Sequence, residues 1–371
     1  MNINNKILKN EERAIFELRE LYQKYGYSQF KMSKFEEYDL YVRNKNFLVS
    51  DNIITFTDTN GKLMALKPDV TLSIIKNSKE NDKGVKKVYY NENVYRISNG
   101  TKSYKEIMQV GLECIGDIDT YNIFEVLKLA ADSLNIISDE FVLDISHLGI
   151  ISYVIERMSV SAEDESELIK CISEKNIDGI VKICKEKGYS SDILEKLVQT
   201  YGTPSEVLKT LKELDLDMCC EYISELSEIV TYLENIGYGG KIKIDFSVIN
   251  DMHYYNGFVF KGFINGISTG VLSGGQYDKL MSKMDKNSKA IGFAVYLDLL
   301  ERFEKSDKRF DVDIVLLYDE NAELSALNDA ISMLTSNGKS VMAQKCMPDK
   351  IKYKQLLKLQ ERGVEIIENN V

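Results

Sequence analysis

The stretch EIMQVGLECIG, residues 106–116, carries the pattern on which the fold assignment rests. Side chains alternate between the two faces of a strand, so Gln109, Gly111 and Glu113 share one face. The opposite face is apolar and consists of Met108, Val110, Leu112 and Cys114. A strand with one apolar face packs that face on a core. The stretch therefore predicts a strand that presents an amide and a carboxylate side by side, with a glycine between them.

This polar strand face has two interpretations. The glycine leaves a gap between Gln109 and Glu113, which could hold a small polar ligand. The alternative is an ordinary solvent-facing surface, because mixed polar faces are common on proteins. Taken alone, the segment favours the solvent-facing alternative.

The segments before this strand predict an α+β core. Apolar residues at helical spacing predict a helix over residues 11–24. Residues 51–71 predict a hairpin around Thr59-Asn60-Gly61, because Asn-Gly tolerates the positive φ angles of a tight turn. Pro68 is expected to start a helix, and residues 85–96 to form a strand.

The segments after it continue the pattern and define two domains. Residues 124–135 predict a helix, and the charged, helical residues 161–239 predict a helical insertion. Residues 241–263 predict strands, Ser273-Gly274-Gly275 a turn, and residues 290–303 a helix. The core is therefore expected to span residues 1–305. Residues 306–371 predict a small α/β unit of β-α-β-α-β order, with helices over 321–337 and 350–362.

Composition restricts the class of protein. A chain of 371 residues with 44% hydrophobic content can bury a large core. No run approaches the roughly 20 apolar residues that span a bilayer, and the first residues lack a signal-peptide core, so we expect a cytoplasmic protein without a membrane partner. A formal charge of -11 argues against a nucleic-acid partner. Six cysteines without a CxxC pair and two histidines predict reduced thiols, no metal site and no cofactor.

Two further segments combine ordinary structural residues with ligand-binding chemistry. In residues 66–71, LKPDVT, proline and aspartate are normal at a helix start, yet Asp69 and Thr71 can also accept hydrogen bonds from an ammonium group. In residues 253–257, HYYNG, the aromatic side chains fit core packing as well as a binding pocket. Gly274 and Gly275 have the composition of a phosphate-binding turn, but a glycine pair is too common to establish one.

In this order, the segments resemble the catalytic core of class II aminoacyl-tRNA synthetases, in particular the histidine branch, over residues 5 to 305. LKPDVT resembles the family's L-R-P-D/E-x-T element, and VYR with YKEIMQVGLECIG resembles its second motif. HYYNGFVF and SGGQYDKL resemble the histidine-specific and glycine-rich segments, and AIGFAVYLDLL stands at the third motif. The resemblance implies an antiparallel sheet flanked by helices, with the helical insertion and the small C-terminal α/β unit added.

The chain departs from this family at the groups that bind ATP. A synthetase neutralises a triphosphate with arginines, since guanidinium stays charged and binds phosphate bidentately. By the resemblance, Leu299 stands at the arginine of the third motif, and Asn250, beside Asp251, stands at the arginine before HYYNG. Lys105 replaces another arginine in a shortened loop, and Arg96 is the remaining candidate phosphate contact.

The positions that hold the amino acid in the family are kept. The resemblance places Asp69, Thr71 and Gln109 around the α-ammonium group, Glu113 toward the imidazole, and two tyrosines along the ring. The implied ligand-binding set for histidine is Asp69, Thr71, Arg96, Gln109, Glu113, Tyr254 and Tyr255, with no catalytic residue.

A kept pocket with lost arginines resembles the regulatory subunits of ATP phosphoribosyltransferase. The resemblance implies a non-catalytic subunit in the first step of histidine biosynthesis. Such a subunit self-dimerises within a heteromultimer, enables a separate short catalytic subunit and conveys feedback inhibition by L-histidine. Two alternatives stay open: an active histidyl-tRNA synthetase, and a stand-alone amino-acid-binding protein of the same fold.

Overall fold

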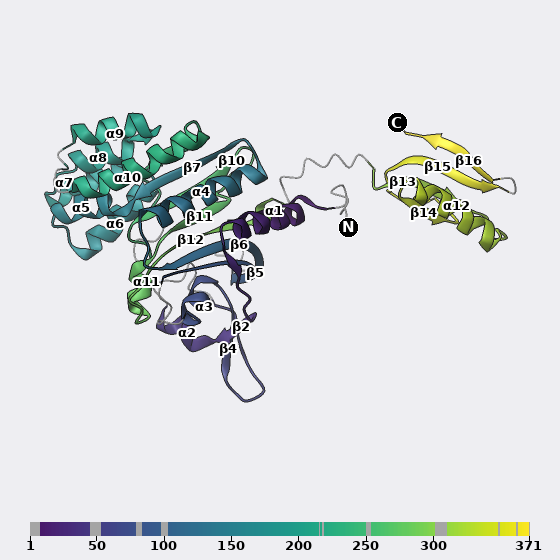
Figure 1. The fold of residues 1–371 in the computed structure, drawn as a ribbon, viewed down its shortest axis with the longest axis horizontal. Helices are drawn as coiled ribbons and strands as arrows, with labels where there is room; N and C mark the ends of the chain where they lie inside the picture. The colour runs from purple at the N-terminus through teal and green to yellow at the C-terminus, as the bar shows by residue number, and fades with distance from the viewer. Residues whose placement is uncertain are drawn as a thin grey trace. The chain divides into compact units, whose positions relative to one another are not determined.

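The computed structural model describes residues 8–44, 53–78, 84–97, 103–214, 216, 219–249, 254–300, 310–347, 349–360 and 363–370. Its contacts separate two compact units, Met1–Phe303 and Glu304–Val371, and each is described by itself (Figure 1).

A mixed, mostly antiparallel sheet organises the first unit. Its nine strands follow the order β1-β5-β6-β12-β11-β10-β7-β9-β8, and only the β1–β5 and β7–β9 pairs are parallel. The strands are β1 (Ser28–Gln29), β5 (Val85–Ile97), β6 (Tyr104–Gly116), β7 (Phe141–His147), β8 (Tyr201–Gly202), β9 (Ile242–Asp245), β10 (Phe258–Ile264), β11 (Leu272–Gln276) and β12 (Lys289–Tyr296). The strand expected over residues 106–116 is β6, and it lies between β5 and β12.

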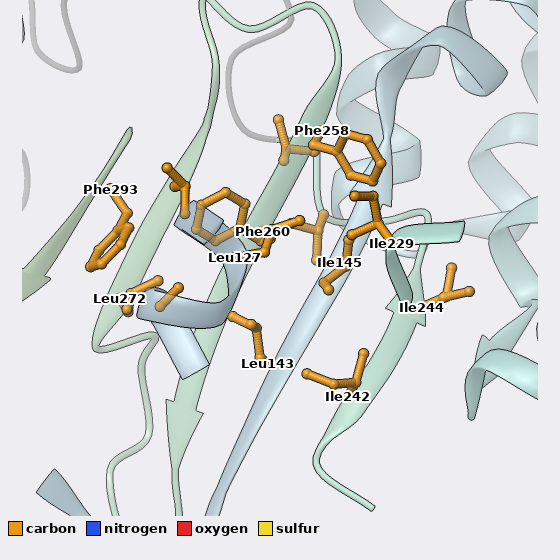
Figure 2. Close-up of a cluster of buried hydrophobic side chains, with 14 of the residues drawn as sticks. Leu127, Leu143, Ile145, Ile229, Ile242, Ile244, Phe258, Phe260, Leu272 and Phe293 are labelled. Carbon is orange, nitrogen blue, oxygen red and sulfur yellow. The ribbon is translucent and has the colours of Figure 1, made fainter. Parts of the chain in front are cut away.

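Two helices cover one face of this sheet. Helix α1 (Asn10–Lys24) contacts α4 (Thr120–Ile137), which begins at the N-cap Asp119 and crosses β7, β10 and β12 (Figure 1). Their apolar sides share one buried cluster with the sheet. Figure 2 shows part of it, where Leu127 of α4 lies over apolar side chains from β7, β10 and β11. The α+β class and the expected, mostly antiparallel sheet with flanking helices are confirmed.

A smaller subassembly packs at the β5 end of the first unit. It contains a three-stranded sheet of order β2-β4-β3, and its hairpin turns at Gly61 with a φ of +80°. This subassembly consists of β2 (Phe35–Glu37), α2 (Tyr38–Arg43), β3 (Thr55–Thr57), β4 (Leu63–Leu66), α3 (Thr71–Lys76) and α11 (Asp278–Lys283). Helices α2, α3 and α11 and strand β4 share a second buried cluster with β5 and β6.

Helices fill the segment between β7 and β9, as the charged repeats predicted. Most of them form the helical insertion, residues 161–239, beside the β7–β9 end of the sheet (Figure 1). The helices are α5 (Leu148–Arg157), α6 (Ala162–Ser173), α7 (Ile177–Lys187), α8 (Asp192–Gln199), α9 (Pro204–Glu213), α10 (Cys220–Leu233) and the π-helix η3 (Glu234–Tyr238).

The second unit is a four-stranded sheet of order β14-β13-β15-β16 with one helix. Its elements are β13 (Val312–Leu317), α12 (Leu324–Ser336), β14 (Val341–Gln344), β15 (Tyr353–Gln360) and β16 (Gly363–Asn369). The helix expected over residues 350–362 is wrong, because that segment supplies β15. Leu356 and Leu357 point to opposite faces of the sheet and both are buried, an arrangement that a central strand provides.

Three expectations for the first unit are also wrong. The helix over residues 290–303 is instead strand β12 followed by a short 3-10 helix, η4 (Leu297–Leu299). The expected turn at residues 273–275 lies inside β11; a Cβ on Gly274 would come 2.4 Å from the Gly292 carbonyl oxygen, so close strand packing requires this glycine. Helix α3 begins at Thr71, three residues after Pro68.

Candidate functional site

The candidate site lies on the sheet face opposite α4, and we call it the site face. Strand pairing aligns Glu113 of β6 with Gly292 of β12 and then Gly275 of β11. The next row aligns Gly111, Ala294 and Ser273. The floor beside Glu113 is therefore built from small residues, which leaves space above the sheet for larger side chains or a ligand.

Glu113 is held in a fixed orientation by two hydroxyl groups. Its side chain is 2% exposed. Thr71 donates a hydrogen bond to Oε1 at 2.8 Å, and Tyr277 donates one to Oε2 at 2.6 Å. A Cβ on Gly292 would come 1.8 Å from Oε2, so the glycine is needed for the carboxyl group to lie where it does.

Burial controls the charge of Glu113. Desolvation raises the pKa of Glu113 to about 8, although the hydrogen bonds from Tyr277 and Thr71 favour the ionised form. At neutral pH the empty site therefore holds this carboxyl group mainly as a neutral acid. A neutral buried acid can donate a hydrogen bond or transfer a proton to a basic ring nitrogen.

The start of α3 brings Asp69 and Thr71 to the same place. The backbone N–H of Leu72 donates to Asp69 Oδ1 at 3.0 Å, as at an N-capped helix start. Burial raises the pKa of Asp69, and the Arg96 guanidinium opposes that shift. Arg96 Nε donates to the Pro68 carbonyl oxygen at 3.1 Å, so Arg96 also fixes the backbone beside Asp69.

Tyr254 and Tyr255 form one aromatic wall, which we call the tyrosine pair. Their ring centroids are 4.5 Å apart, and Tyr254 lies 5.8 Å from the ring of Tyr277. The Tyr255 ring covers Gly275, since a Cβ there would come 2.6 Å from Tyr255 Cδ1. The wall thus closes the site above the small-residue floor.

Gln109 lies on the same face of β6, four residues before Glu113. It is 4% exposed and pairs in register with Tyr296 of β12 and Glu92 of β5. The structure brings the seven predicted residues to one face of β6 and the elements around it. The solvent-facing interpretation of this strand face is wrong, because Gln109 and Glu113 are both buried.

Sequence reasoning missed several residues of this site. Tyr277 belongs to the quoted segment SGGQYDKL, but its contact with Glu113 joins positions 164 residues apart and left no local signal. Tyr90 is 2% exposed, and its hydroxyl would lie 2.5 Å from a Cβ on Gly111. Burial and the nearby Glu113 carboxyl raise the pKa of Tyr90 well above its ordinary value. Tyr90 therefore fills the gap that Gly111 creates.

The structure describes some of the positions at which this sequence lacks the arginines of a synthetase. Leu299 ends η4 and packs against the main apolar cluster. Lys105 is exposed and pairs in register with Arg96. The positions Asn250, Asp251 and His253 lie outside the described residues. In the described part of the chain, no group of three or more His, Cys, Asp or Glu side chains is arranged to hold a metal ion.

The fold and the site together define a class of protein: a class II synthetase-like chain with a buried glutamate held by two hydroxyl groups on one face of its sheet. The family model described as Histidyl-tRNA synthetase matches residues 3–300. The chain therefore belongs to the histidyl-tRNA synthetase family.

Within this family, the chain is similar to proteins named for a regulatory role. It is 25% identical to the ATP phosphoribosyltransferase regulatory subunit of Oceanobacillus iheyensis, over 96% of this chain and 90% of that protein. It shares its fold with a structure titled as an ATP phosphoribosyltransferase regulatory subunit/histidyl-tRNA synthetase from Bacillus halodurans, with a TM-score of 0.76, 22% identity and 96% coverage of both chains. It also shares its fold with a chain of the ATP phosphoribosyl transferase (HisG:HisZ) complex of Thermotoga maritima, with a TM-score of 0.62 and 20% identity. The match covers 80% of this chain and 98% of that chain.

Proposed function

We propose that this chain is a non-catalytic regulatory subunit of ATP phosphoribosyltransferase, which acts in the first step of histidine biosynthesis. In this role it binds a separate short catalytic subunit, enables its activity and conveys feedback inhibition by L-histidine. The names of its relatives and the complex that contains one structural neighbour support the role. A cytoplasmic location and self-dimerisation within the heteromultimer belong to the same proposal; among the described residues, no helix is long and apolar enough to cross a bilayer.

The observation that carries the proposal is the combination of a kept acidic pocket with a hydrophobic residue at an ATP-binding position. Glu113 and Asp69 stand at positions that the family resemblance assigns to the amino acid, while Leu299, at the implied arginine position, is partly buried against the main apolar cluster. A leucine cannot neutralise a phosphate group. The pocket therefore supports ligand binding without aminoacyl-adenylate formation.

The proposed ligand contacts follow from the site geometry. Asp69 accepts hydrogen bonds from the α-ammonium group, and Gln109 and Thr71 add polar contacts. Glu113 meets the imidazole, and the tyrosine pair lines the ring. Arg96 is the cation closest to Asp69 among these residues, and its guanidinium is the proposed contact of the α-carboxylate.

The main competing function is an active histidyl-tRNA synthetase, which the family match favours. Calorimetric titration with L-histidine and histidine-dependent exchange of pyrophosphate into ATP separate the two. We expect saturable histidine binding and no exchange above the enzyme-free background. Exchange activity would overturn the regulatory proposal in favour of a synthetase, and absent histidine binding would remove the proposed ligand site.

A further inference from the structure

His147 joins the helical insertion to β10, on the sheet face opposite the site face. It ends β7, is 3% exposed, and packs its ring between two aromatic side chains from different parts of the chain. Tyr222 of α10 stacks on it at a centroid distance of 5.1 Å and an interplanar angle of 24°, and Phe258 of β10 meets it edge-on at 4.9 Å. Glu225 Oε2, one turn along α10, lies 3.3 Å from His147 Nε2.

This contact is closely packed. A Cβ on Gly149 would come 2.8 Å from Tyr222 Cδ2 and 2.9 Å from His147 Cε1, so the first turn of α5 leaves no spare volume. Figure 2 shows Ile229 of α10 beside Ile145 and Phe258, which continues the same contact along the helix. A shift of α10 must therefore move the buried ring of His147 or separate it from the Tyr222 ring, which is 39% exposed.

From His147 the backbone contacts continue to Asn256 and Gly257, the two residues that follow the tyrosine pair. His147 pairs in register with Phe258, and the Leu148 N–H donates to the Gly257 carbonyl oxygen at 2.9 Å. The Phe258 N–H donates to Gln276 Oε1 at 2.6 Å, and the Asn256 N–H donates to the Gln276 carbonyl oxygen at 3.0 Å. The backbone that follows Tyr255 is thus fixed between β7 and β11.

We infer that the helical insertion positions the tyrosine pair through His147, so that ligand binding and the packing of α10 on the core are coupled. The inference rests on the proposed histidine site and adds the route of its regulation. His147 is a positioning residue, since it acts on the ligand pocket through Gly257 and Phe258. A partner that binds the insertion would change the affinity for histidine, and histidine would change the affinity for that partner by the same factor.

Hydrogen exchange on the full chain, with and without saturating L-histidine, tests this coupling. We expect histidine to slow amide exchange in residues 254–258 and also in residues 220–226 of α10, with no change in α6 and α7. Protection of residues 254–258 without protection of α10 would overturn the inference and leave the ligand site intact. No protection in either segment would remove the ligand site and the inference together.

Matched substitutions on α10 test the route itself. Tyr222→Leu removes the stack on His147, and we expect L-histidine to bind roughly fivefold or more weakly in calorimetry. Tyr222→Phe keeps the stacked ring and should retain the parent affinity. Tyr232→Leu is the control, because Tyr232 is on the same helix and packs on Phe124, 5.9 Å away. Equal histidine affinity in Tyr222→Leu and Tyr232→Leu, each with the fold verified by circular dichroism, would overturn the role of His147.

Discussion

At the scale of single residues, the site depends on how one buried carboxyl group is satisfied. Glu113 accepts hydrogen bonds from Thr71 and Tyr277 before any ligand arrives. A ligand must therefore join or replace these partners, since an orphaned buried polar group would cost about 1 to 3 kcal/mol. The hydroxyl groups of Thr71 and Tyr277 therefore keep the Glu113 carboxyl group hydrogen-bonded without a cation.

Removing the Glu113 carboxyl group should weaken the proposed ligand contact. We expect Glu113→Ala to reduce the affinity for L-histidine by about 1.5 to 3 kcal/mol, the usual contribution of a charge-assisted hydrogen bond. Isothermal titration calorimetry measures this change. An unchanged dissociation constant would mean that histidine binds elsewhere on the chain.

The raised pKa of Glu113 also predicts a pH dependence of stability. The pKa of Glu113 is about 8 in the folded protein, against the ordinary value of 4.5 that applies in the unfolded chain. The protonated carboxyl group therefore contributes its full free energy of stabilisation below about pH 4.5, and this contribution is lost as the pH rises through 8. Glu113→Gln should lessen the fall in unfolding free energy between pH 6 and pH 9 by about 1 to 3 kcal/mol relative to the parent protein. Urea denaturation at both pH values measures it. Burial and Asp245 also raise the pKa of Asp144 to about 7. Asp144 is present in both proteins, so its contribution cancels in the difference between their unfolding free energies. An equal decrease in unfolding free energy in Glu113→Gln and the parent protein would contradict the raised pKa of Glu113.

At the scale of elements, glycine allows the strands near the site to pack closely. Gly292 lies opposite Glu113, and a Cβ there would also come 2.5 Å from the Leu112 carbonyl oxygen. We expect Gly292→Ala to lower the free energy of unfolding by about 1 to 3 kcal/mol through overpacking. Gly240→Ala is the control, because a Cβ at Gly240 meets nothing within 4 Å. Equal unfolding free energies in chemical denaturation would contradict this account of the floor.

The elements that could be predicted were those with a clear period. Residues 108–114 alternate strictly and lie within β6, and the hairpin turn has a positive φ at Gly61, though not at Asn60. The helix expected over residues 290–303 failed because a short apolar run fits a buried strand as well as a helix. Such a run can be assigned only from its neighbours, and here β6 and β11 pair with it on both sides.

The site could be predicted only in part, for a different physical reason. Asp69, Thr71 and Glu113 were found because local motifs contain them. Tyr90 and Tyr277 were missed because their roles depend on strand register and on contacts between distant segments. The coupling through His147 likewise joins β7 to a helix more than 70 residues further along the chain, and no local pattern indicates it.

At the scale of the whole molecule, the net charge of -11 argues against a tRNA partner. The insertion, residues 161–239, carries 17 acidic side chains and eight lysines, so it repels a phosphate backbone. We expect tRNA to bind no more tightly than nonspecifically, with a dissociation constant above about 1 µM at physiological salt. Filter binding measures this constant. Submicromolar binding with a preference for histidine tRNA would instead favour the synthetase alternative.

The measurement that tests the central claim most directly is phosphoribosyl transfer to ATP by a short-form catalytic subunit. The assay is run with and without this chain and over a titration of L-histidine. The regulatory role predicts activity that requires the chain and falls as histidine is added, with the inhibition weakened in Glu113→Ala. A transfer rate that this chain leaves unchanged, with no complex between the two proteins in analytical ultracentrifugation, would contradict it.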